Sequence, residues 1–234
     1  MKNIYIVTVC RNALYDLKET VNNIAKINAN LENRIEHVII DGDSSDGTKE
    51  FLLDIKEAVY YCISEPDKGI YDAMNKGWNV VPEESYVLFI GAGDKITSLP
   101  KLENKTVDVI YGSVDLERNK IFKSFINWRT NLSNTLHHQA MLILKKAPFL
   151  NSPFNSKYKI YGDYDMNLNM INEGFSFHYA EDFLAYAKPG GISHDFNHKE
   201  NLNVVFSNKG FFWAVIALIR WGYCSMRRKL KRDF

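Results

Sequence analysis

Acidic side chains directly follow two of the apolar strands that the sequence predicts. The predicted strand at residues 35–40 leads into Asp41 and the acidic run 41–48, and the predicted strand at residues 86–90 leads into Gly91-Ala92-Gly93-Asp94. In open α/β sheets, ligands bind beyond the carboxyl ends of the strands. Carboxylates at such positions can hold base and ribose hydroxyls and can bind the hard divalent cation that bridges a diphosphate. The pattern therefore predicts a site for a nucleoside diphosphate.

Helix capping is an alternative role for part of the acidic run. Ser45, Asp46 and Thr48 precede a helical pattern, and such side chains commonly accept from the free N–H groups at a helix start. Asp41 ends the strand itself, so it is the better ligand candidate. For Asp94 alone, an ordinary turn acid is an equally good interpretation.

Two further segments carry polar residues that could do chemistry. Residues 64–77, Ser-Glu-Pro-Asp-Lys-Gly-Ile-Tyr-Asp-Ala-Met-Asn-Lys-Gly, are too polar for a core, and Lys68 could offset phosphate charge. Residues 161–168 place Asp163 and Asp165 at the start of a predicted helix. A carboxylate within hydrogen-bond reach of an acceptor hydroxyl can act as a general base. The alternatives are an N-cap for Asp163 and a helix-start acid or supporting partner for Asp165.

The elements that must position these residues alternate between strand and helix. Apolar residues at spacings of three and four predict helices after the first two strands, at residues 14–27 and 51–59. Strands are predicted at residues 4–9, 35–40, 59–64, 86–90, 107–111, 140–144 and 177–180, and further helices at residues 70–78 and 164–172. This alternation predicts an α/β fold with a mainly parallel, mixed sheet flanked by helices. In the second half, a mixed extension of the same sheet is the simpler interpretation.

Composition restricts the class of protein. Of the 234 residues 46% are hydrophobic and 24% are charged, which is typical of soluble globular proteins. With 29 Lys+Arg against 28 Asp+Glu, the net charge of +1 gives no whole-molecule attraction to nucleic acid. Three cysteines with no Cys-x-x-Cys pair predict free thiols in a reduced compartment. The short apolar start at residues 4–10 is expected to be a buried strand rather than a signal peptide.

The last 24 residues differ from the rest of the chain. Nine apolar residues, 211–219, precede a tail with six basic residues from Arg220 to Arg232, and nine residues cannot cross a bilayer, which needs roughly 20. The segment is predicted to be an amphipathic helix in the membrane interface, with Trp213 and Trp221 at headgroup depth. Packing of this helix on the core is the alternative. We expect residues 1–208 to form the main domain and residues 209–234 the basic appendage.

Three motifs in this order resemble those of family-2 glycosyltransferases with the GT-A fold. They are Asp-Gly-Asp-Ser-Ser-Asp-Gly-Thr at residues 41–48, Glu-Pro-Asp-Lys-Gly-Ile-Tyr-Asp-Ala-Met-Asn-Lys-Gly at residues 65–77, and Phe-Ile-Gly-Ala-Gly-Asp at residues 89–94. The resemblance covers roughly residues 1–194 and is nearest to small bacterial enzymes of surface-polysaccharide assembly, of the colanic-acid, O-antigen or capsule type. It implies a nucleotide-sugar donor with UDP or GDP, a divalent cation (Mn²⁺ or Mg²⁺) and inversion at the anomeric carbon.

The resemblance also assigns roles to residues of this chain. Asp41 would hold the nucleobase, Asp94 would bind the metal, and Asp163, matching the second position of a Glu-Asp pair, would be the catalytic base. Residues 137–139, His-His-Gln, resemble a His-Gln segment near the acceptor. His194 could reach the metal or the diphosphate, although a solvated loop residue is the alternative. The implied substrate- and nucleotide-binding set is Asp41, Asp67, Lys68, Gly69, Ile70, Tyr71, Asn75, Gly93 and His138.

Two departures from the family pattern leave other functions open. Gly93 and Gly162 stand where many members have an acid, which allows a non-catalytic protein that binds sugar nucleotides. A nucleotidyltransferase is a further alternative, although the chain lacks a Gly-rich N-terminal phosphate loop. The favoured function is transfer of a sugar to a hydroxyl of a saccharide, expected to be lipid-linked, in cell-surface polysaccharide synthesis. The expected location is the cytoplasmic face of a bacterial inner membrane, as a peripheral protein.

Overall fold

The chain folds around one mixed β-sheet. The computed structural model describes residues 3–29, 35–102, 107–116, 120–149, 151–190 and 197–230, with the backbone alone for residues 226–230. The strands are β1 (Ile4–Cys10), β2 (Ile35–Asp41), β3 (Tyr61–Ser64), β4 (Tyr86–Gly91), β5 (Lys95–Ser98), β6 (Val109–Asp115), β7 (Ile121–Lys123), β8 (Met141–Leu144) and β9 (Phe177–Tyr186). The helices are α1 (Leu14–Asn28), α2 (Thr48–Ile55), α3 (Ile70–Val80), α4 (Gly162–Asn172), α5 (His198–Lys209) and α6 (Phe211–Leu230).

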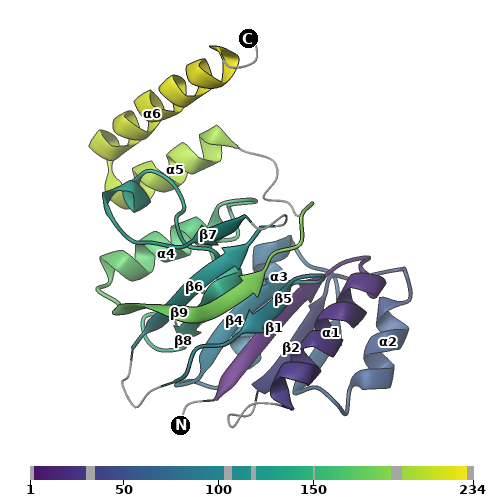
Figure 1. The fold of residues 1–234 in the computed structure, drawn as a ribbon. Helices are drawn as coiled ribbons and strands as arrows, with labels where there is room; N and C mark the ends of the chain where they lie inside the picture. Colours follow the sequence, from purple (N-terminus) through teal and green to yellow (C-terminus); the bar gives the residue numbers. More distant parts are fainter. Residues whose placement is uncertain are drawn as a thin grey trace.

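The sheet has a parallel half and a mixed half. Its order is β3-β2-β1-β4-β8-β6-β9-β5, with β7 paired to β6. Strands β1 to β4 are parallel to one another, whereas β8 runs antiparallel to both β4 and β6. The predicted mixed extension of one sheet is therefore confirmed. Figure 1 shows α1 and α2 beside the parallel half, α4 beside the mixed half, and α5 and α6 stacked beyond α4.

Apolar side chains fill both faces of the sheet. On one face, Met74 and Trp78 of α3 and Met166 of α4 pack against strand residues such as Val7 and Phe89. On the other face, α1 contributes Leu17 and Ile24. Strands buried on both faces read as continuous apolar runs, which is why β1 and β4 were predictable from the sequence.

A third apolar cluster joins the C-terminal helices to the body of the molecule. Leu168 of α4, Val204 and Val205 of α5, and Ala217 of α6 are buried together in it. Trp213 also packs there, and Trp221 lies with its ring centroid 4.2 Å from that of His198. Both indoles thus contact the protein, although Trp221 remains exposed, and their placement at headgroup depth stays a prediction.

The outer side of α6 is apolar and exposed. The exposed large apolar side chains of α6 are Phe211, Phe212, Leu218, Ile219, Trp221 and Tyr223. Over the described ranges, no helix combines the length and apolarity needed to cross a membrane. The chain turns between α5 and α6 at Gly210, whose φ of 82° lies in the left-handed region. The division into residues 1–208 and 209–234 stays a prediction.

Several elements differ from the sequence prediction. Helix α3 continues two residues beyond its predicted end at residue 78. Gly77 within it allows the helix to lie against β1, since a Cβ there would be 2.3 Å from Cγ1 of Val7. Strand β9 is longer than predicted, and β5, β7 and α5 were not predicted. The three cysteines, Cys10, Cys62 and Cys224, are free, as expected.

Candidate active site

The carboxyl ends of the parallel strands bring the first acidic motif to one edge of the sheet. In the strand register, Asp41 pairs with Cys10 on one side and with Ser64 on the other, and Gly91 pairs with Val9. The loops that follow β2, β3 and β4 therefore begin side by side. This is the edge at which an open α/β sheet binds its ligands.

The Asp41 carboxylate is fully buried and saturated with hydrogen bonds. It accepts from the Ser44 N–H at 3.0 Å, from the Ser44 hydroxyl, from the Ser64 hydroxyl at 2.6 Å and from the Cys10 thiol at 3.6 Å. These contacts use the roughly four lone-pair positions of a carboxylate. A nucleobase could reach Asp41 only by displacing one of the hydroxyls.

Asp46 has the capping role that was predicted for it, and at two helices. Its carboxylate accepts the N–H of Leu14, the first residue of α1, at 2.9 Å, and the N–H of Thr48, the first residue of α2, at 3.2 Å. Ser45, by contrast, donates to Asn12 and caps neither helix, and the Thr48 hydroxyl donates to Asp46. Asp46 thus joins the starts of α1 and α2.

The second motif forms the loop into α3. Asp67 Oδ1 accepts the N–H of Gly69 at 2.9 Å, and its other oxygen lies against Gly42, where a Cβ would be only 2.3 Å away. Gly69 has a φ of 123°, which favours glycine. Lys68 is exposed beside it, and Ile70 begins the helix. The structure therefore brings Asp67, Lys68 and Gly69 next to the loop after β2.

Asn75 does not contribute to that surface. Its amide donates to the carbonyl of Phe154 at 2.8 Å and accepts the N–H of the same residue at 3.0 Å. Both functional ends of the side chain are thus used to hold the backbone at residue 154. The predicted substrate-binding position at Asn75 lies in a structural contact between α3 and the segment before α4.

Asp94 closes the turn after β4. Its carboxylate accepts the N–H of Gly91 and the N–H of Lys188, both at 2.8 Å, and it also interacts with Gln139. Burial raises the pKa of Asp94, while these hydrogen bonds and nearby His138 oppose that rise. The two backbone hydrogen bonds use two of the roughly four lone-pair positions, so the carboxylate keeps accepting capacity for a cation. Mg²⁺ is often held by one or two protein carboxylates plus substrate phosphates, so the turn fits a diphosphate-bridged cation.

Packing accounts for the missing acid at Gly93. Its φ is +94°, and an added Cβ would be 2.4 Å from Cδ of Lys188. The stem of Lys188 lies across this glycine, and its ammonium pairs with Asp16 on α1. The Lys188 stem therefore occupies the space that a side chain at residue 93 would need.

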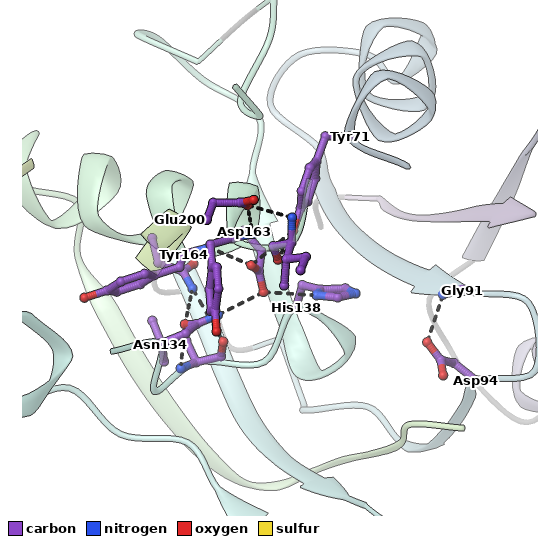
Figure 2. A network of polar contacts seen from close by, with 12 residues as sticks. Tyr71, Gly91, Asp94, Asn134, His138, Asp163, Tyr164 and Glu200 are labelled. Atoms are coloured by element: carbon purple, nitrogen blue, oxygen red, sulfur yellow. Dashed lines mark hydrogen bonds and ion pairs between the residues drawn. The ribbon is translucent and has the colours of Figure 1, made fainter. Parts of the chain in front are cut away.

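Asp163 lies in the first turn of α4, held by side chains from three other parts of the chain. It accepts from Asn134 Nδ2 at 2.9 Å and from the Tyr71 hydroxyl at 3.3 Å, and His138 Nδ1 lies 3.5 Å from its Oδ2. The helix begins at Gly162 with Tyr161 as its N-cap residue, so Asp163 is not the N-cap. Figure 2 shows His138 between Asp163 and the turn that carries Asp94. The structure therefore brings together Tyr71, His138 and Asp163.

The second departure from the family pattern, Gly162, is also explained by packing. A Cβ at this position would be 2.7 Å from ring carbons of Tyr71. That ring is buried and stacks on Phe154 with centroids 5.4 Å apart, so it cannot readily move. The absence of a side chain at residue 162 is what allows the Tyr71 hydroxyl to reach Asp163.

Asp165 points away from this group, as predicted for a supporting residue. It is buried, accepts from Asn208 of α5 at 2.7 Å and from Asn169 at 3.3 Å, and burial raises its pKa. His137 also differs from its neighbour: it packs edge-on against Phe122, and burial lowers its pKa to about 4. Asp163 and His138 therefore face the site, whereas Asp165 and His137 support the fold.

One predicted site residue lies outside the described part of the chain, and three residues of the site were not predicted. His194 lies outside the described residues. Within the described ranges, no group of three or more His, Cys, Asp or Glu side chains could hold a metal ion. Sequence reasoning missed Asn134, Lys188 and Glu200. Of these only Glu200 carried a signal, since it follows Asn197 at the spacing of a capping box.

The sequence of this chain is similar to those of known glycosyltransferases. A family model described as glycosyl transferase family 2 matches residues 5–160 of this 234-residue chain. A PGL/p-HBAD biosynthesis glycosyltransferase of Mycobacterium bovis is 27% identical over 205 residues, which cover 80% of this chain and 79% of that protein. An uncharacterised glycosyltransferase of Mycobacterium tuberculosis is 39% identical over 72 residues, 31% of this chain and 27% of its own length.

Solved structures share the fold at low sequence identity. S. aureus TarS 1-349 in complex with UDP matches with a TM-score of 0.62 and 16% identity, over 89% of this chain and 65% of that one. In another structure of TarS 1-349, with a TM-score of 0.59, this chain spans 60% of the length. The mannosyltransferase PcManGT from Pyrobaculum calidifontis, in complex with GDP-Man and Mn²⁺, matches with a TM-score of 0.61 and 14% identity, over 94% of this chain and 75% of that one. These neighbours identify the arrangement as the GT-A fold.

Proposed function

This chain belongs to glycosyl transferase family 2, and from that premise we propose that it is an inverting enzyme that moves a sugar from a nucleoside-diphosphate sugar to a hydroxyl group of a saccharide. The observation that carries the proposal is the hydrogen-bonded group of Tyr71, His138 and Asp163 beside the Asp94 turn. One carboxylate would act on the acceptor and the other on the diphosphate, which is the division of work that a single-displacement transfer needs.

Asp163 would take the proton from the acceptor hydroxyl as that hydroxyl attacks the anomeric carbon. The Asn134 amide donates to Oδ2 and the Tyr164 N–H donates to Oδ1 at 2.8 Å, while the Tyr71 hydroxyl lies 3.3 Å from Oδ1, so the carboxylate is held in one orientation. Its side chain keeps 13% exposure, and the acceptor hydroxyl would reach Oδ2 by taking the place of His138, whose Nδ1 is 3.5 Å away. A base held in this way contributes to the transition state rather than to binding of the sugar donor.

The diphosphate would lie at the Asp94 turn, and UDP or GDP are the expected nucleotides. A divalent cation, Mn²⁺ or Mg²⁺, would be held by Asp94 and would offset the charge that develops on the departing diphosphate. Lys68 adds a positive charge at the loop into α3. Asp41 and Asp67 would form the nucleobase end of the pocket, with a serine hydroxyl giving way at Asp41. The TarS and PcManGT structures, with UDP and with GDP-Man and Mn²⁺, support this proposal by their fold.

A non-catalytic protein is less well supported than an enzyme. That alternative depended on glycines at positions 93 and 162. Both glycines have packing explanations, the Lys188 stem at one and the Tyr71 ring at the other. A nucleotidyltransferase is disfavoured by membership of the glycosyltransferase family.

We further propose a lipid-linked acceptor used in cell-surface polysaccharide synthesis, at the cytoplasmic face of a bacterial membrane. What supports this is the outer side of α6, where Phe211, Phe212, Leu218, Ile219 and Tyr223 are exposed and basic residues follow in the sequence. Each basic residue near an anionic surface contributes roughly 1 kcal/mol. Anionic liposomes should therefore carry the protein on flotation and release it in salt. Leu218→Glu with Ile219→Glu should abolish flotation without unfolding; unchanged flotation would refute attachment through this side of α6.

The transfer itself can be tested with a panel of nucleotide sugars. Release of nucleoside diphosphate with and without Mn²⁺ identifies the sugar donor, and the anomeric configuration of the glycosylated product distinguishes inversion from retention. A panel in which no nucleotide sugar binds or is consumed would contradict the proposed function. Consumption of nucleoside triphosphate instead would indicate a nucleotidyltransferase.

A further inference from the structure

Three consecutive backbone N–H groups just before α4 converge on one carboxylate. Glu200 Oε1 accepts the N–H groups of Lys159, Ile160 and Tyr161 at 2.9, 2.7 and 2.8 Å. Hydrogen bonds to an ionised acceptor are about twice as strong as those between neutral groups. The segment that leads into Gly162 and Asp163 is thus bound at three successive residues by a side chain some forty positions later in the chain.

The same segment is held from its other side by Tyr71. The Tyr71 hydroxyl donates to the carbonyl of Ile160 at 2.6 Å and lies 3.3 Å from Asp163 Oδ1. The N–H of Ile160 goes to Glu200, and its carbonyl goes to Tyr71. Figure 2 shows Glu200 and Tyr71 meeting this segment above the Asp163 carboxylate. The position of Asp163 therefore depends on both side chains.

Glu200 is itself firmly placed. It lies in the first turn of α5, where the Asn197 side chain accepts its N–H at 3.2 Å. Helix α5 is joined to α4 by the hydrogen bond from Asn208 to Asp165 and by the buried Val204 and Val205. In a capping box, a glutamate three residues after the cap turns back to its own helix. Here the glutamate reaches out to the segment before another helix.

We propose that Glu200 is a positioning residue for the reaction: it sets the start of α4 so that Asp163 and Tyr71 meet in one geometry. This inference rests on the proposed function, since Asp163 acts as base only in a transferase. Displacements of about 1 Å in a reacting group can cost 100-fold in rate. The contribution of Glu200 should accordingly appear in kcat and leave the KM for the sugar donor nearly unchanged.

The test is a double-mutant cycle in the full chain with Glu200→Ala and Tyr71→Phe. Glu200→Ala should lower kcat at least about 10-fold with a KM for the sugar donor within about twofold, and Glu200→Gln, whose amide oxygen still accepts, should recover most of the loss. Because both side chains hold Ile160, the double variant should lose at least about threefold less than the product of the single losses. Lys199→Ala, at the preceding position on α5, is the matched control and should leave kcat at the parent value.

Amide hydrogen exchange of peptides that span residues 157–165 separates the two claims. Faster exchange there in Glu200→Ala than in the parent and the control would show that Glu200 holds this segment. Three results would each overturn the proposal. They are unchanged amide exchange in Glu200→Ala, a double variant whose loss in kcat equals the product of the single losses, and a parent-like kcat for Glu200→Ala. A parent protein that transfers no sugar, yet shows the exchange difference, would instead refute the proposed function and confine Glu200 to a structural role.

Discussion

At the scale of single residues, Asp163 and Asp165 lie two positions apart but have different surroundings and different proposed roles. The Asp163 carboxylate meets a hydroxyl, an amide and an imidazole at the edge of the site, and keeps part of its surface open. The Asp165 carboxylate is buried against two asparagine amides, and burial raises its pKa. Only the first can approach a substrate. Asp165→Asn should therefore affect the joint between α4 and α5 more than the chemistry.

Asp94 is the residue on which metal dependence can be tested. Asp94→Asn keeps an oxygen for one of the two backbone N–H donors but removes the charge that would hold a cation. Turnover in Mn²⁺ should fall about 100-fold or more, because a bound cation stabilises developing charge by several kcal/mol. A Mn²⁺ titration of diphosphate release measures this, with circular dichroism to confirm folding. Parent-like turnover in Mn²⁺ would remove Asp94 from the metal site.

His37 makes a prediction about stability and pH. It is buried in β2 with Nε2 2.8 Å from the Thr8 hydroxyl, and burial lowers its pKa to about 3. Between pH 6.5 and 5 the unfolded chain therefore binds a proton that the folded chain does not, so the free energy of unfolding falls as the pH falls. Buried His137, with its pKa near 4, acts in the same direction.

Replacing His37 should flatten that pH dependence. In His37→Gln, the fall in the free energy of unfolding between pH 6.5 and 5 should lessen by up to one proton, about 1.4 kcal/mol per pH unit. Urea unfolding at several pH values measures the slope. A slope equal to that of the parent would mean that His37 is protonated in the folded protein.

At the scale of elements, two glycines are needed because a helix lies close to a neighbouring element there. Gly77 lets α3 lie on Val7 of β1, and Gly162 lets the start of α4 lie on the Tyr71 ring. Both contacts involve α3, the helix that carries Tyr71 to the site. The distances from α3 to β1 and from α3 to the start of α4 should therefore affect function as well as stability.

Gly77→Ala tests this close approach. The added methyl would meet Val7, so we expect a loss of about 1–3 kcal/mol in the free energy of unfolding. Gly222 of α6 is the matched control, since a Cβ there meets nothing within 4 Å. Gly222→Ala should be neutral or should stabilise by up to about 1 kcal/mol. Equal effects of the two substitutions in urea unfolding would contradict the packing argument.

How much could be predicted differs between elements. Strands β1 and β4 are nearly continuous apolar runs, β2 contains the apolar run 38–40, and α1 has clear helical spacing. The parallel half was therefore readable from the sequence. Strand β7 has three residues, and α5 is mostly polar, with its apolar contact made chiefly by Val204 and Val205. Neither has a pattern of its own. Their conformation depends on packing partners, the preceding strand β6 for β7 and helix α4 for α5.

The site follows the same rule. Tyr71, His138 and Asp163 were predicted because they lie in motifs, and the structure brings them together. Asn134, Lys188 and Glu200 were missed because each acts through a contact with a residue far away in the sequence. The Lys188 N–H meets Asp94, and Asn134 meets Asp163. No local pattern specifies such contacts.

At the scale of the whole molecule, three parts meet at the proposed site. The parallel half of the sheet supplies the Asp41 and Asp94 edge, the mixed half supplies His138, and the C-terminal helices hold the segment before Asp163 through Glu200. Figure 1 shows α5 and α6 stacked on the side of α4 away from α1 and α2. Helix α6, with its exposed side, thus packs in the same group of helices as α4, which carries Asp163. A lipid-linked acceptor held at α6 would therefore lie at the same end of the molecule as the proposed base.

The most direct test of the central claim, that Asp163 is the base of a sugar transfer, is calorimetric binding of the sugar donor combined with turnover for Asp163→Asn. We expect the sugar donor to bind with parent affinity while kcat falls about 10²–10⁴-fold, as for loss of a general base. Parent-like transfer by Asp163→Asn, or loss of sugar-donor binding together with turnover, would contradict the account and leave Asp163 a structural residue of the α4 start.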